Sequence, residues 1–331
     1  MNILLLAWNR FRRGGPKGNV GHELFRRELA KYHNVVFYGL KYFCNYSPDV
    51  TLDDLLEKYG KPDFVFTHIE HREGHFPIGI FDELGKLGIL KVHYCGDYDR
   101  RTWNPYDNHF KEAQYDIIFV PEAQVLRDLK EHGIGGKQFV LPHGVDTSIF
   151  YDQHLEKSFD VAAPIGHNER YRRQLKKFVD ELSVRTTIEI AKFEKYTKRI
   201  NESKIIVTCS SLKQLSFKYT EVLACGTLIM GDKPEDLDRL GFKDGEHLIL
   251  YDDFKDLGNK IDYFLKHDKE REMIAKNGME FVRKYHSNRV RVAEFIEMIQ
   301  TVKQVDWNER INQNYTPSFK EMIRAIVRSE K

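Results

Sequence analysis

The stretch of sequence that decides the fold is Lys218-Tyr219-Thr220-Glu221-Val222-Leu223-Ala224-Cys225-Gly226-Thr227-Leu228-Ile229. We expect a helix over residues 217–224 and a buried strand over 227–230. Ala224, Cys225 and Gly226 join the two, and such small residues allow the helix to pack close to a sheet. A helix that leads directly into a buried strand is typical of a parallel α/β sheet.

Apolar runs and helical patterns alternate on both sides of this stretch. In the first half, strands are expected at residues 3–7, 35–38, 64–67, 90–95 and 117–120, and helices at 22–33, 51–59 and 77–88. In the second half, strands at 159–163, 187–190, 205–209, 227–230 and 248–251 alternate with helices at 169–182, 217–224, 254–266, 269–284 and 287–302. Loops are expected after 90–95 and 117–120, a capping box at Thr51–Asp54, and a last helix near 318–327. The rhythm predicts two successive doubly wound α/β domains.

The alternation stops at Leu141-Pro142-His143-Gly144-Val145-Asp146, a turn-rich stretch that we interpret as an interdomain linker. We therefore expect one Rossmann-like domain at residues 1–143 and a second at 144–303, facing each other across a cleft. Residues 304–331 are expected to form a C-terminal segment with a helix that can cross back to the first domain. Sheets of this kind bind ligands at the carboxyl ends of their strands.

The composition is that of an ordinary soluble protein. The 331 residues are 41% hydrophobic and 31% charged, and the net charge of +2 does not by itself indicate a polyanion-binding protein. The cysteines lack metal-ligand spacing and suit a reducing compartment; they are Cys44, Cys95, Cys209 and Cys225. No apolar run approaches the roughly 20 residues of a membrane span. We therefore expect a cytoplasmic protein, whose contact with any membrane would be peripheral.

The order of motifs in the second half resembles that of the group 1 glycosyltransferases, broadly family 4, which have the GT-B fold. Residues 218–229 are similar to the family's donor-nucleotide signature, and residues 245–251 to its glycine-led strand. Residues 232–240 resemble the loop and helix after the signature. Residues 271–286 are similar to the closing helix with its terminal His, and residues 141–150 to the linker. The Lys-x-x-Glu form resembles the spore-coat-maturation-like branch, where Arg commonly stands at the position of Lys218.

The resemblance implies an enzyme that moves a sugar from a nucleotide-diphosphate donor, UDP- or GDP-linked, to a saccharide, lipid-linked or small-molecule acceptor. It also implies retention of configuration at the sugar and no metal or other cofactor. The acceptor would bind to the first domain and the donor to the second. The chain departs from the family's E-x7-E pattern at Lys213, where the family often has a Glu that touches the donor sugar. The identity of the sugar therefore stays open.

The same stretch predicts a donor site on physical grounds. Residues 210–216 join a buried strand to the expected helix, whose first N–H groups carry the positive end of its dipole. A diphosphate suits that position, and Lys218 adds a full charge. Glu221 follows about one turn later, where its carboxylate can accept hydrogen bonds from two ribose hydroxyls. The predicted donor-binding residues here are Ser211, Lys218, Tyr219, Thr220 and Glu221; the alternative is a solvated helix face.

Two further segments are candidates for the diphosphate. Arg170, Arg172 and Arg173 open the helix after the first strand of the second domain. We favour Arg170 or Arg173 as a clamp for the leaving group, and a solvated surface is the alternative. In the first domain, Gly14 and Gly15 would allow the backbone to approach the transferred sugar and phosphate, or would belong to a mobile surface loop.

Catalytic groups are expected where strands of the first domain end, because these ends meet at the ligand-binding edge. Asp97 follows the strand at 90–95 and is our first choice for a catalytic or acceptor-positioning carboxylate. His93 is the second candidate, and its place on the strand also suits a core histidine.

The acceptor is expected to meet Arg12, Arg13 and His68. The two arginines belong to a basic loop that could steer an anionic acceptor. His68 opens a His-rich run that also contains Glu70, His71 and His75. This run has no helical His-x-x-x-His spacing, so we do not predict a metal site there.

Three other functions stay open at this point. One is transfer to a modified base in DNA, for which the basic loop at 10–17 with Arg100, Arg101 and Trp103 would bind phosphates and a flipped base. The net charge of +2 weighs against it. The others are a GT-B-fold sugar-nucleotide epimerase and a noncatalytic sugar-nucleotide-binding subunit. The sequence does not indicate an oligomeric state.

Overall fold

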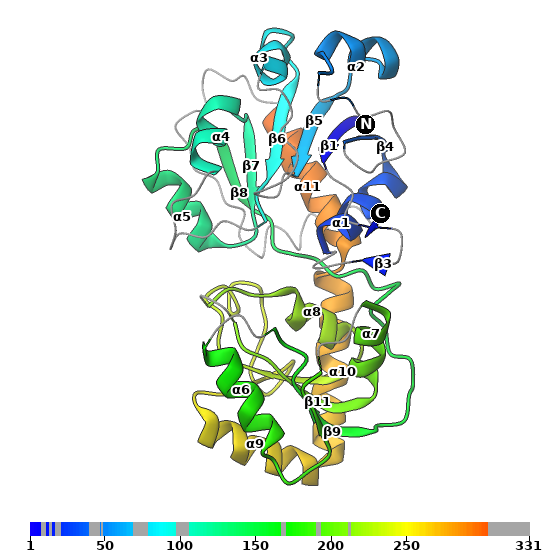
Figure 1. Ribbon diagram of the computed structural model, residues 1–331, viewed down its shortest axis with the longest axis vertical. Helices are drawn as coiled ribbons and strands as arrows, with labels where there is room; N and C mark the ends of the chain where they lie inside the picture. Colours follow the sequence, from blue (N-terminus) through cyan, green and yellow to red (C-terminus); the bar gives the residue numbers. More distant parts are fainter. Residues whose placement is uncertain are drawn as a thin grey trace. The chain divides into compact units, whose positions relative to one another are not determined.

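The computed structural model describes residues 1–7, 11–12, 15–16, 21–39, 47, 49–68, 79–96, 106–166, 170–189, 193–210 and 213–303. The chain divides into two compact units (Figure 1). The first comprises Met1–Pro142 together with Arg291–Lys331, and the second comprises His143–Val290. Each unit is an α/β structure built on its own parallel sheet, which confirms the predicted fold class.

The first unit contains a six-stranded sheet in the order β4-β1-β5-β6-β7-β8. Its strands are β1 (Asn2–Ala7), β4 (Asn34–Tyr38), β5 (Phe64–His68), β6 (Leu90–Tyr94), β7 (Ile117–Val120) and β8 (Lys137–Val140). A small antiparallel pair, β2 (Phe11–Arg12) and β3 (Gly15–Pro16), follows β1. The helices are α1 (Gly21–Tyr32), α2 (Leu52–Tyr59), α3 (Gly79–Lys86), α4 (Tyr106–Ala113), α5 (Ala123–Glu131) and α11 (Asn288–Lys303).

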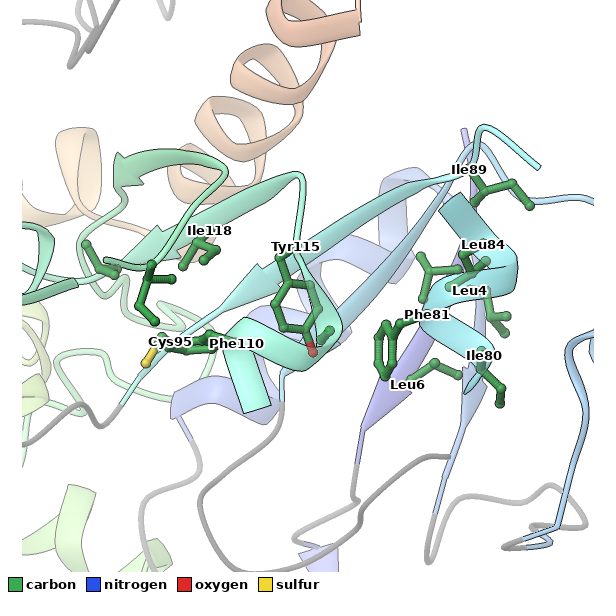
Figure 2. Packing of buried hydrophobic residues seen from close by; sticks show 14 of the residues in the cluster. Leu4, Leu6, Ile80, Phe81, Leu84, Ile89, Cys95, Phe110, Tyr115 and Ile118 are labelled. Carbon is green, nitrogen blue, oxygen red and sulfur yellow. The ribbon is translucent and has the colours of Figure 1, made fainter. Parts of the chain in front are cut away.

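Alternate residues of β1 enter two different cores, one on each face of the sheet. Leu4 and Leu6 pack with side chains of α2, α3, α4 and α5, including Phe81 and Phe110 (Figure 2). Ile3, Leu5 and Ala7 pack on the other face with α1 and with α11, whose Phe295 is fully buried. The period of two along the strand therefore produces a sheet covered by helices on both faces.

The second unit contains a five-stranded parallel sheet in the order β10-β9-β11-β12-β13. Its strands are β9 (Phe159–Ala162), β10 (Thr186–Thr187), β11 (Ser203–Val207), β12 (Leu228–Gly231) and β13 (Ile249–Leu250). Its helices are α6 (Arg170–Asp180), α7 (Phe193–Asn201), α8 (Phe217–Ala224), α9 (Phe254–Lys266) and α10 (Asp268–Tyr285). One core joins β9, β11, β12 and β13 to α6, α9 and α10.

Several predicted elements differ from the structure. The expected loops after 90–95 and 117–120 contain α4 and α5, and α5 begins three residues after β7 ends. Residues 193–201 form α7, which was not expected. The strand expected at 187–190 is β10 at Thr186–Thr187, an edge strand that pairs only with β9. The predicted helix at 318–327 lies outside the described residues. Within the described part of the chain, no helix is both long and apolar enough to cross a membrane.

Candidate functional site

The sheet of the second unit changes direction of winding between β9 and β11. β9 pairs with β10 on one side and with β11 on the other, so the chain runs outward in both directions from this point. The loops that leave the carboxyl ends of β9 and β11 separate there. Open α/β sheets bind ligands at such a switch point. The segments that meet at it are residues 163–166 and the loop from β11 to α8.

Helix α8 begins in this loop without a side-chain cap. Ser216 is its N-cap residue by backbone conformation, yet the Ser216 side chain makes no capping hydrogen bond. Ser216 Oγ and Thr208 Oγ1 are both buried and have no hydrogen-bond partner among the described residues. The first turn of α8 also contains no acidic residue. The positive end of the helix dipole is therefore not offset by a carboxylate of its own first turn.

Asp232, directly after β12, holds the start of this loop. Its carboxylate accepts hydrogen bonds from the backbone N–H of Ser210 at 2.6 Å and from Ser210 Oγ at 2.8 Å. The Tyr219 hydroxyl donates to the backbone carbonyl of Asp232 at 2.7 Å. Tyr219 is fully buried, and a Cβ at Gly231 would lie 2.3 Å from its hydroxyl. The loop and the first turn of α8 are thus fixed to the end of β12.

Lys218 and Glu221 lie one turn apart on α8 and are both half-buried. Burial raises the pKa of Glu221, and the Lys218 ammonium and the Tyr196 hydroxyl partly oppose this shift. Burial lowers the pKa of Lys218, and Glu221 partly restores it. The Lys218 Nζ lies 5.2 Å from the centre of the Tyr196 ring, which belongs to α7. The predicted pair is therefore a partly desolvated site with opposite charges rather than a solvated helix face.

Of the three arginines that open α6, Arg172 is the one whose positive charge lowers the pKa of Lys218. Arg172 Nη1 also lies 3.9 Å from the position that a Cβ at Gly166 would take. It is half-buried, whereas Arg170 and Arg173 are exposed. Arg172 and Lys218, from two different helices, are thus near enough for their charges to interact.

The other predicted donor-binding residues lie in different surroundings. Tyr219 and Thr220 face the interior of the unit, and the Thr220 hydroxyl donates to the Phe217 carbonyl at 3.1 Å. Phe217 in turn stacks on His143, with 4.0 Å between the ring centres. Ser211 lies outside the described residues.

In the first unit, His68 ends β5 at the equivalent switch point, paired with Ala7 of β1. Arg26 of α1 donates from Nε to His68 Nδ1 at 3.3 Å and from Nη2 to the His68 carbonyl at 3.1 Å. Arg26 also forms an ion pair with Glu23 at 3.3 Å, and all three side chains are buried. His22 packs edge-on against His68, with the ring centres 4.3 Å apart. A cluster of buried polar groups therefore lies at the carboxyl edge of this sheet.

His93 is completely buried in the core of the first unit. Its Nδ1 lies 2.7 Å from Thr67 Oγ1, and its ring stacks on Tyr115 with 4.8 Å between the centres. Burial, together with the charge of His109, lowers its pKa well below the ordinary value. These surroundings match the core histidine that we gave as the alternative.

The other candidates of the first unit have little or no described structure. Asp97, Gly14 and Arg13 lie outside the described residues, and so do Glu70, His71 and His75. The backbone of Arg12 pairs with that of Gly15 in the β2–β3 hairpin. Among the described residues, no three His, Cys, Asp or Glu side chains gather as a metal site requires.

Sequence reasoning missed Tyr196 and Asp232 as parts of the site. The spacing of Phe193, Tyr196 and Ile200 would have indicated a helix at 193–201. No local pattern indicates that Tyr196 meets α8, because the contact joins residues far apart in the chain. Asp232 carried a signal, since it directly follows an apolar strand and so belongs to the carboxyl edge.

Residues 153–297 match the family described as glycosyl transferase-like. Among solved structures, sucrose-phosphate synthase from Thermosynechococcus elongatus has 13% identity and a TM-score of 0.61, covering 92% of this chain and 100% of that chain. HepE of Anabaena in complex with UDP has 11% identity and a TM-score of 0.60, covering 91% and 100%. An alpha-glucosyltransferase in complex with UDP has 12% identity and a TM-score of 0.64, again covering 91% and 100%.

A comparison with curated protein sequences gives no match. The solved structures confirm the GT-B fold over nearly the whole chain. The placement in the spore-coat-maturation-like branch stays a prediction. The second unit thus matches the glycosyl transferase-like family, and the chain has the GT-B fold of these solved structures.

Proposed function

We propose that the enzyme transfers a sugar from a UDP-linked donor to a saccharide, lipid-linked or small-molecule acceptor. The observation that carries this proposal is the pairing of Lys218 and Glu221 on the first two turns of α8, with the charge of Arg172 acting on Lys218. UDP is favoured over GDP because two similar structures, HepE and the alpha-glucosyltransferase, were solved with UDP bound.

In the proposed site the diphosphate lies at the uncapped start of α8. Lys218 and Arg172 supply two positive charges there, and the helix dipole adds to them. The hydroxyl of Ser216, the N-cap residue of α8, can donate a hydrogen bond to a phosphate oxygen. The Glu221 carboxylate accepts from the ribose hydroxyls. This requires the ionised form, so the raised pKa of Glu221 predicts weaker donor binding in acid.

During transfer the bond between the sugar C1 and the phosphate oxygen breaks, and an acceptor hydroxyl oxygen forms a new bond to C1. The electron pair of the broken bond leaves with UDP, and the acceptor proton passes to a base or to solvent. Negative charge therefore develops on the diphosphate, where Lys218 and Arg172 stabilise it. Two fixed cations can take the part that a divalent ion plays elsewhere, which supports a metal-independent reaction. Retention of configuration at C1 is part of the same proposal.

The acceptor is proposed to bind to the first unit, near the switch point that His68 occupies. Arg12 and Arg13 of the segment after β1 would attract an anionic acceptor, and Gly14 and Gly15 would allow close approach of the donor. Asp97, three residues after the end of β6, stays our candidate for the catalytic or acceptor-positioning carboxylate.

Mass spectrometry of reaction mixtures tests the proposal. The enzyme is incubated with UDP-, GDP- and ADP-linked sugars and a panel of acceptors, each with and without excess EDTA. We expect a glycosylated product and UDP from a UDP-sugar, at the same rate in both series. Activity that EDTA abolishes and one divalent metal restores would contradict metal independence. Duplex DNA belongs in the acceptor panel, because an alpha-glucosyltransferase of similar fold was solved with UDP and a 13-mer DNA.

A further inference from the structure

Tyr196 of α7 contacts both charged residues of the proposed donor site. The Lys218 Nζ lies over its ring at 5.2 Å from the ring centre. A cation over an aromatic face at this distance is attracted by the ring quadrupole. On another side the ring meets Phe150 at 6.2 Å between centres, edge to face. The ring is therefore held between a core aromatic side chain and the Lys218 ammonium.

The Tyr196 hydroxyl is buried and lies within reach of the Glu221 carboxylate, but the two do not meet strict hydrogen-bond geometry. Glu221 is the charged group that acts on it, and burial with that charge raises the Tyr196 pKa well above its ordinary value. The hydroxyl therefore keeps its proton and stays a donor. A buried donor without a well-formed hydrogen bond costs free energy, so its presence beside a ligand-binding carboxylate needs a reason.

We propose that Tyr196 is a positioning residue of the donor site, whose ring seats the Lys218 ammonium and whose hydroxyl holds the Glu221 carboxylate toward the donor ribose. The inference rests on the proposed function, because it assigns a role within the same site. When the donor binds, the hydroxyl donates to one oxygen of the carboxylate and leaves the other to accept from the ribose. The loose interaction between the hydroxyl and the carboxylate in the free protein thereby becomes a well-formed hydrogen bond in the complex.

Calorimetry with UDP and 2′-deoxy-UDP tests the hydroxyl. Tyr196→Phe keeps the ring under Lys218 and removes only the hydroxyl. We expect it to bind UDP about tenfold more weakly than the wild type, as for the loss of one hydrogen bond to a charged group. Binding of 2′-deoxy-UDP should change less, so the preference for UDP should shrink. The matched control is Tyr263→Phe, which removes an exposed hydroxyl that donates to Glu270 at 2.8 Å and should leave both affinities unchanged.

The melting temperature of the free protein separates a positioning role from a structural one. If Tyr196 were merely structural, Tyr196→Phe would lower the melting temperature without nucleotide. Since the hydroxyl makes no well-formed hydrogen bond before the donor binds, Tyr196→Phe should change the melting temperature little without nucleotide. A variant that melts earlier and binds UDP as tightly as the wild type would assign Tyr196 a structural role and overturn the proposal.

Failure of the inference can be told apart from failure of the proposed function. If Glu221→Ala loses UDP binding while Tyr196→Phe retains it, the donor site stands and the role of Tyr196 is wrong. If the wild type binds no nucleoside diphosphate, the proposed function fails, and the role of Tyr196 fails with it. The inference is supported when both variants lose affinity and Tyr196→Phe also loses its preference for the 2′-hydroxyl.

Discussion

Arg170, Arg172 and Arg173 are neighbours on the first turn of α6, and their surroundings differ. Arg172 is half-buried and acts on Lys218, whereas Arg170 and Arg173 are exposed. We therefore expect Arg172→Ala to weaken UDP binding by about 1.5–3 kcal/mol, the range for a lost hydrogen bond to a charged group. Arg173→Ala is the matched control and should change the dissociation constant much less. A larger loss from Arg173→Ala in calorimetry would restore the clamp that the sequence favoured.

The burial of His93 predicts how the free energy of unfolding depends on pH. Its pKa is lowered well below 6.5 because burial excludes the charged form. The folded protein therefore leaves His93 neutral while the unfolded chain binds a proton below pH 6.5. The stability from this residue is present above pH 6.5 and is lost as the pH falls, by up to about 1.4 kcal/mol per pH unit.

Denaturant unfolding between pH 7.5 and 5 measures this effect. His93→Gln should show a shallower fall in unfolding free energy than the wild type, and the exposed His132→Gln should keep the wild-type slope. Parallel curves for wild type and His93→Gln would mean that His93 titrates normally, and the core role would then be wrong.

At the scale of elements, α8 is positioned by close packing against α10. A Cβ at Gly278 would lie 2.3 Å from the His247 carbonyl oxygen and 2.6 Å from Leu223 of α8. We expect Gly278→Ala to lower the free energy of unfolding by about 1–3 kcal/mol, because neighbouring backbone must shift. Gly258 lies inside α9 with its nearest contact at 3.5 Å. Gly258→Ala should therefore raise stability, by up to about 1 kcal/mol. Urea unfolding measures the change in unfolding free energy for both variants. Equal changes in Gly278→Ala and Gly258→Ala would contradict this prediction.

Local pattern predicted the elements whose boundaries are set locally. The helices at 217–224 and 254–266 have the predicted bounds, and Thr51 and Asp54 form the predicted capping box of α2. α5 was missed because the helix is short and its stability comes from Val125 and Leu129 packing into the core. β10 was misplaced because an edge strand extends only as far as its neighbour pairs with it, and sequence does not specify that pairing.

The candidate site divides in the same way. Lys218 and Glu221 were predictable because both lie on one helix and their spacing in the sequence places them one turn apart. Arg172 and Tyr196 belong to α6 and α7, which meet α8 only through the packing of the second unit. Their roles depend on distances between side chains that are remote in sequence, which no local pattern contains.

At the scale of the whole molecule, both units are parallel α/β sheets with polar residues at the switch point, and the residues differ between the units. Each sheet places a polar cluster at the switch point beside its first strand, around Lys218 in one unit and around His68 in the other.

We expect neutralising Arg12 and Arg13 together to raise the acceptor KM and to leave donor affinity nearly unchanged. With an anionic acceptor the wild-type KM should rise with salt, since exposed charges are screened over about 8 Å at physiological ionic strength. Loss of donor affinity in steady-state kinetics of this double variant would assign the loop to the diphosphate instead.

The central claim is that the start of α8 binds the nucleotide of the donor, and calorimetry of Glu221→Ala with UDP tests it most directly. We predict that the wild type binds UDP and that the variant binds it about 1.5–3 kcal/mol more weakly, because the ribose loses a charged acceptor. The variant should remain folded, since the half-buried carboxylate it loses is one that burial already disfavours in its charged form. A folded Glu221→Ala protein that binds UDP with wild-type affinity would contradict the account.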